Sequence, residues 1–115
     1  MPSQHNCIDY IEFHATDISA TKKFYAAVFG WKFTDYGPDY TSFEDGRLAG
    51  GFDKSGSVSK GGPLVVLFCS NLEKSLADVK SHGGKISKDI FSFPGGRRFH
   101  FSDPSGNELA VWSDK

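Results

Sequence analysis

The chain has 115 residues, of which 38% are hydrophobic and 15% aromatic, so it can form one domain with a sizeable core rather than a disordered chain. Its formal net charge is −1 and no basic cluster exceeds the pair Arg97-Arg98, which argues against nucleic-acid binding. Two cysteines outside any CxxC pair, with no apolar run near the about 20 residues of a membrane span, predict a cytoplasmic protein with reduced thiols and no membrane partner.

The segment Cys7–Ala15 alternates with the period of a β-strand. One face of this predicted strand carries Tyr10, Glu12 and His14, while the opposite face is more apolar. The strand therefore presents a row of polar side chains on one side.

A helix is predicted next. Asp17 or Ser19 can provide its N-cap, Phe24 lies in its apolar stripe, and Gly30 is placed to end it. Extended segments follow at residues 31–35, 40–44 and 47–52, which completes a first β-α-β-β-β unit over residues 7–53.

The polar, Gly- and Ser-rich residues 54–62 are typical of a flexible connection, and the same order of elements restarts after them. An apolar strand carries Leu64, Val66 and Phe68 on one face, and a second helix and further strands follow. A shift of 54 residues places Asp17 on Asn71 and Gly30 on Gly84. We therefore predict a single domain over residues 1–115, with a second unit at 63–113.

The chain ends in a predicted hairpin, in which two alternating runs flank the turn sequence DPSGN. The core face of this hairpin collects Phe99, Phe101, Leu109 and Val111. The opposite face collects Arg98, His100, Glu108, Ala110 and Trp112. A cation, an imidazole, a carboxylate and an indole side by side form an unusual surface unless something binds there.

The segment DISATKKFYAAVFGW, the hairpin GGRRFHFSDPSGNELAVW and the doubled unit resemble the vicinal oxygen chelate superfamily of glyoxalase I, bleomycin- and fosfomycin-resistance proteins and extradiol dioxygenases. The resemblance covers essentially the whole chain. It implies an α+β fold in which two βαβββ units form a curved mixed sheet around a cleft, and it implies a homodimer. It does not specify an activity, because this fold hosts metal enzymes as well as metal-free binding proteins.

The resemblance also implies where a metal would bind. Enzymes of this superfamily take metal ligands from cleft-facing positions that fall here at Tyr10, Leu64, Ala110 and Gly50 or Gly51. Leucine and alanine cannot ligate a divalent metal, and tyrosine rarely does. We therefore expect no cofactor. The alternative is a divalent zinc, nickel, manganese or iron ion on a different set of ligands, namely Glu12, His14, His100 and Glu108.

The sequence is compatible with two functions. A third possibility is a structural dimer whose cleft binds nothing. The first is a metal-independent protein that holds a small organic ligand in an aromatic cleft, with binding residues Tyr10, His14, Phe68, Arg98, Glu108 and Trp112. The second is a glyoxalase-like lyase or isomerase, with His100 and Glu12 as acid and base. An ion pair between Glu12 and Arg98 is a structural alternative for both side chains, and Trp112 could either close the cleft by packing or stack on a ligand.

Overall fold

The computed structural model describes residues 3–58 and 61–115, so residues 59–60 of the predicted connection lie outside the described residues. The elements follow one another in this order: β1 (Tyr10–His14), α1 (Ile18–Phe29), β2 (Lys32–Asp35), β3 (Tyr40–Glu44), β4 (Ala49–Asp53), β5 (Val65–Phe68), α2 (Leu72–Ser81), β6 (Lys85–Phe93), β7 (Gly96–Ser102) and β8 (Glu108–Ser113). Neither described helix is long and apolar enough to cross a membrane.

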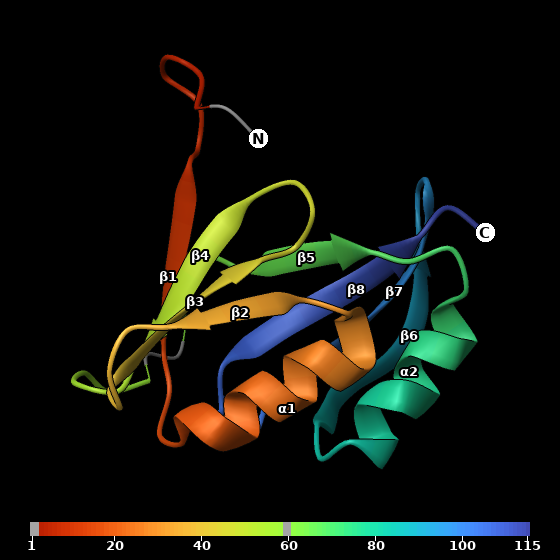
Figure 1. Cartoon of the computed structure of the whole chain (residues 1–115). Helices are drawn as coiled ribbons and strands as arrows, with labels where there is room; N and C mark the ends of the chain where they lie inside the picture. Colours follow the sequence, from red (N-terminus) through yellow and green to blue (C-terminus); the bar gives the residue numbers. More distant parts are fainter. Residues whose placement is uncertain (1–2, 59–60) are drawn as a thin grey trace.

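The strands form two four-stranded sheets, with the orders β1-β4-β3-β2 and β5-β8-β7-β6. In each sheet the first strand pairs in parallel with the last, and the remaining pairs are antiparallel. This confirms the predicted doubled β-α-β-β-β fold. The two sheets stay separate in the described part of the chain, and Figure 1 shows both helices on the lower side of the molecule, with α1 beneath the first sheet's strands and α2 beside β6.

Both helices begin where the sequence predicts. The side chain of Asp17 accepts a hydrogen bond from the backbone N–H of Ala20 at 3.0 Å, and Asn71 accepts one from Lys74 at 3.1 Å. Helix α1 ends at Gly30, whose φ of 73° lies in the left-handed region that glycine adopts at little cost. The caps thus fix the helix boundaries from local sequence alone.

The core lies between the helices and the inner faces of both sheets. The four hairpin residues that alternation assigns to the core are fully buried: Phe99, Phe101, Leu109 and Val111. Phe24 of α1 lies 5.9 Å from Phe101 of the second sheet, and Tyr25 lies 5.1 Å from Phe52 of the first, between ring centroids. Helix α1 therefore joins the two units through aromatic contacts, each fully buried ring contributing about 1.5–3 kcal/mol by its burial.

Candidate functional site

The face of the second sheet that points away from the core carries the polar residues that the hairpin sequence predicts there. The strand register places Arg98 opposite Trp112 and His100 opposite Ala110. The same register extends across the sheet, with Phe91 of β6 opposite Arg98 and Phe68 of β5 opposite Trp112. We call the following residues the outer face of the second sheet: Phe68, Phe91, Phe93, Arg98, His100, Glu108, Ala110 and Trp112.

Arg98 is partly buried and lies against aromatic rings. Its guanidinium carbon is 5.3 Å from the ring centroid of Phe91 and 5.6 Å from that of Phe93. Its Nε is buried without a hydrogen-bond partner, and among the residues that the structure describes no carboxylate forms an ion pair with it. Its neighbour Arg97, on the other face of β7, instead forms an ion pair with Glu73 at 2.6 Å. The Arg98 cation is thus held by aromatic rings rather than by an acid.

His100 is 7% exposed and lies under the same aromatic ring, 5.9 Å from the centroid of Phe91. Its Nδ1 is 3.5 Å from a carboxylate oxygen of Glu108, which also accepts a hydrogen bond from the hydroxyl of Ser87 at 3.1 Å. The Nε2 of His100 is buried without a partner in the described part of the chain. Buried polar atoms without partners are uncommon, so this imidazole is a candidate for a functional group.

Trp112 and the phenylalanines around it provide flat apolar surface beside Arg98. The ring of Phe68 meets the Trp112 ring edge-on at 5.2 Å, and Phe93 lies 6.3 Å from it. Phe68 is 56% exposed and Trp112 is partly buried. Trp112 therefore packs against its neighbours and still leaves part of its ring open.

A second group of polar side chains lies on the first sheet. Tyr10 and Glu12 of β1 meet Tyr40 of β3 there, a residue that no sequence pattern marks. Tyr40 of β3 donates a hydrogen bond to a carboxylate oxygen of Glu12 at 2.9 Å, and its hydroxyl also hydrogen-bonds that of Tyr10. Because Tyr40 has one hydroxyl proton and gives it to Glu12, Tyr10 must donate to Tyr40. Burial, with these hydrogen bonds, raises the pKa of Tyr40 well above its usual value.

Gly51 is what allows Tyr40 to lie across the first sheet. A Cβ at this position would collide with the hydroxyl oxygen of Tyr40 and crowd that of Tyr10. From the sequence, Gly51 is expected in a strand and near a ligand position of the superfamily, but the register that sets it beneath Tyr40 depends on the pairing of β3 with β4. No sequence motif signals this contact.

His14 does not join the tyrosine group. Its ring lies against Gly56, where a Cβ would collide with it, and its Nδ1 is 3.4 Å from the backbone carbonyl oxygen of Asp53. The contact to Gly56 and the backbone carbonyl beside its Nδ1 fit a structural role for this imidazole.

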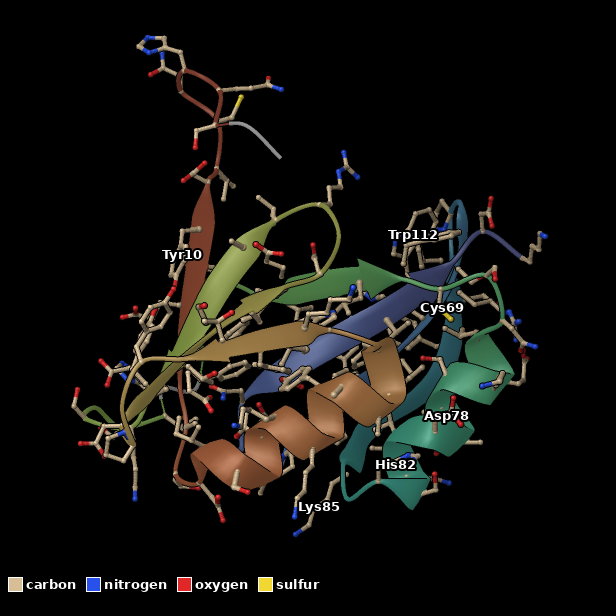
Figure 2. The ribbon with its side chains drawn as sticks, in the orientation of Figure 1. Tyr10, Cys69, Asp78, His82, Lys85 and Trp112 are labelled. Atoms are coloured by element: carbon tan, nitrogen blue, oxygen red, sulfur yellow. The ribbon has the colours of Figure 1, made fainter. Side chains whose placement is uncertain are left out.

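The two groups of candidate residues lie on different sheets. Figure 2 shows Tyr10 on β1 and Trp112 on β8 well apart. Arg98 and Glu12 form no ion pair with each other in the described residues, so the structural alternative for this pair is wrong within one chain. Two hollows of about 190 and 340 Å³ lie on the helix side of the molecule, and neither is lined by a predicted site residue.

Comparison with known proteins assigns the family. Residues 7–111 match the sequence profile of the Glyoxalase/Bleomycin resistance protein/Dioxygenase superfamily. The chain belongs to this superfamily. No curated protein sequence matches it.

Solved structures share the fold of this superfamily member at low sequence identity. A glyoxalase/bleomycin resistance protein/dioxygenase family enzyme from Burkholderia phytofirmans superposes with a TM-score of 0.83 at 17% identity, covering 94% of this chain and 100% of that one. Lactoylglutathione lyase from Agrobacterium tumefaciens gives 0.72 at 16% identity, with 96% of each chain covered. A fosfomycin resistance protein from Mesorhizobium loti gives 0.79 at 12% identity, covering 96% of this chain and 93% of that one.

The superfamily often uses a metal, but the residues present do not fit such a site. Its ligand positions, carried over from the resemblance, hold the apolar side chains of Leu64 and Ala110, and Ala110 is fully buried. Within residues 3–58 and 61–115 no group of three or more His, Cys, Asp or Glu side chains could hold a metal. The alternative ligand set is divided between the sheets, with Glu12 and His14 on β1 and His100 and Glu108 on the second sheet.

Proposed function

We propose that this superfamily member binds a small organic molecule on the outer face of the second sheet, without a metal. The observation that carries the proposal is the row that crosses all four strands of this sheet: Phe68, Trp112, Arg98 and Phe91. Three aromatic residues and a cation without a carboxylate partner among the described residues form a surface suited to a flat ligand.

The exposure of this row supports binding rather than packing alone. Phe68 keeps more than half of its surface in contact with solvent, and Trp112 beside it is only partly buried. Contiguous exposed apolar surface on a globular protein commonly marks an interaction site. The absence of ligating side chains at Leu64 and Ala110 favours a ligand held by stacking and polar contacts over one held by a metal.

Binding to a chelator-treated chain tests this proposal. Amide NMR spectra of the metal-stripped protein are recorded with a panel of flat aromatic compounds, and we expect the indole signal of Trp112 to shift while that of the core residue Trp31 stays. A Trp112→Ala variant should lose the affinity, whereas Tyr36→Ala, which removes a 64% exposed aromatic elsewhere, should keep it. Binding that needs an added metal, or no shift on the second sheet, would overturn the proposal.

A second candidate function is a glyoxalase-like lyase or isomerase that uses His100 as acid or base. The observation in its favour is the carboxylate of Glu108 at 3.5 Å from Nδ1, which could orient the imidazole. In one chain Glu108, and not Glu12, lies beside His100. The test is turnover of the adduct of methylglyoxal and glutathione. The enzyme hypothesis predicts that the unmodified chain turns this adduct over. It also predicts that His100→Gln loses the activity but binds the ligand as tightly as the unmodified chain does.

We also propose that the chain forms a homodimer, as the family resemblance implies. Leu64, just before the edge strand β5, and Val66 on that strand are 37% and 42% exposed and would be covered in such a pair. Light scattering should give the mass of two chains, and Val66→Lys should lower it to one. A monomer at all concentrations would contradict the proposal.

A further inference from the structure

We infer that the ligand of the outer face of the second sheet is a flat organic anion, such as an aromatic carboxylate, whose charge lies at Arg98. This inference rests on the proposed function and adds the charge of the ligand to it. Three features of the outer face carry it: its local charge, the desolvation of Arg98, and the position of the rings.

Two cations meet at the Phe91 end of this face, Arg98 and the neighbouring Lys88, although the chain as a whole carries −1. The ring of Phe91 has two cations over it, Arg98 at 5.3 Å and the Nζ of Lys88 at 5.6 Å. The carboxylate of this face, Glu108, is already engaged by Ser87 and lies beside His100. An anionic ligand would therefore meet an attractive field here, and a cationic one a repulsive field.

Arg98 is a partly desolvated cation with no acid to balance it among the described residues. A guanidinium stays charged at every physiological pH, and charged groups taken from water are ordinarily paired. The adjacent Arg97 shows the usual arrangement, since its two terminal nitrogens donate to both carboxylate oxygens of Glu73 at 2.6 and 3.2 Å. A ligand carboxylate can give Arg98 the same two-point contact.

The rings place a flat body next to that charge. Trp112 pairs with Arg98 across neighbouring strands, which lie about 4.8 Å apart in a sheet, and Phe68 continues the apolar surface on the far side of Trp112. An aromatic ring that stacks on Trp112 therefore brings a directly attached carboxylate to the guanidinium.

The test compares benzoate with benzamide, which share one ring and differ in charge. Both are titrated into the metal-stripped, unmodified chain, and the dissociation constants are taken from the indole shift of Trp112. We expect benzoate to bind about tenfold or more tightly, the difference that a hydrogen-bonded charge provides. Equal binding of the two would overturn the inference and leave the proposed function standing. Binding of neither would overturn both.

Variants at the two neighbouring arginines assign the preference to one residue. Arg98→Gln should remove the preference for benzoate, and Arg98→Lys should keep part of it, because lysine retains the charge without the planar fork. The matched control is Arg97→Gln on the opposite face, which should bind both compounds as the unmodified chain does. A preference that survives in Arg98→Gln, or that disappears in Arg97→Gln, would overturn the assignment to Arg98.

Discussion

The hydroxyl of Tyr25 donates a hydrogen bond to a carboxylate oxygen of Asp103 at 2.8 Å, and both residues are buried. This contact joins helix α1 of the first unit to the turn of the last hairpin in the second. The other carboxylate oxygen of Asp103 accepts the backbone N–H groups of Ser105 and Asn107, each at 2.9 Å. Asp103 therefore shapes the turn and also attaches it to the rest of the molecule.

Removing the Tyr25 hydroxyl should destabilise the protein. Tyr25→Phe keeps the ring packing but leaves the buried carboxylate of Asp103 without one donor, which costs about 1–3 kcal/mol of unfolding free energy. Urea titration followed by circular dichroism measures the loss. The matched control, Tyr36→Phe, removes a hydroxyl from a residue that is 64% exposed and should change little. Equal stability of both variants would contradict the structural role of this hydrogen bond.

Asp103 should also give the unfolding free energy a specific pH dependence. Burial raises the pKa of this carboxyl above its ordinary value of 3.8, although hydrogen bonds from Asn107 and Tyr25 oppose the rise. A group whose pKa is higher in the folded chain binds more protons there, so its contribution to stability falls as pH rises from the ordinary to the raised value.

The measurement compares the unmodified chain with Asp103→Asn in urea titrations across this pH range. We expect the unfolding free energy of the unmodified chain minus that of Asp103→Asn to fall as pH rises. Asp35, whose pKa is lowered by hydrogen bonds from Lys22 and Thr41, has the opposite effect but is present in both chains and cancels. A difference that grows with pH would show that the hydrogen bonds outweigh burial at Asp103.

The contact of Gly51 with Tyr40 predicts a local cost for a single methyl group. Gly51→Ala should displace the Tyr40 hydroxyl from Glu12 and lower the unfolding free energy by about 1–3 kcal/mol, as expected for overpacking. Gly62→Ala is the control, because a Cβ there meets no atom of the described residues within 4 Å. Both are measured by thermal unfolding. If Gly51→Ala unfolds at the same temperature as the unmodified chain, β3 and Tyr40 adjust to the added methyl group without strain.

Much of the fold can be predicted from the sequence because helix caps and strand alternation depend on residues only a few positions apart. Asp17 and Asn71 cap the helices through hydrogen bonds to residues three positions on, and Gly30 ends α1 with a positive φ. The alternation of the last hairpin assigns Phe101 to the core and His100 to the other face, and the strand register agrees. None of these features requires knowledge of a distant contact.

The candidate site was only partly predictable because it depends on contacts across strands. Alternation places Arg98 on the correct face, but the rings beside it come from β6, whose pairing with β7 is irregular between Ile86 and Phe91. Likewise, Tyr40 reaches Glu12 only because β3 lies beside β4, which pairs with β1. Register of this kind is set by the whole sheet rather than by any one strand.

Phe91 and Phe68 should separate stability from ligand binding on the outer face of the second sheet. Phe91 is partly buried against Arg98 and His100, so Phe91→Ala should lower the unfolding free energy by about 1–3 kcal/mol through lost burial and cation–π contact.

Phe68 is 56% exposed at the other end of the row, so Phe68→Ala should leave the unfolding free energy within about 0.5 kcal/mol of the unmodified value. It should nevertheless weaken benzoate binding, because it removes the ring that meets Trp112 edge-on at 5.2 Å and continues the apolar surface for the ligand. Urea titration and NMR titration of the same two variants measure both effects. A Phe68→Ala chain that binds benzoate with unchanged affinity would place the ligand nearer Phe91 and Phe93 than Trp112.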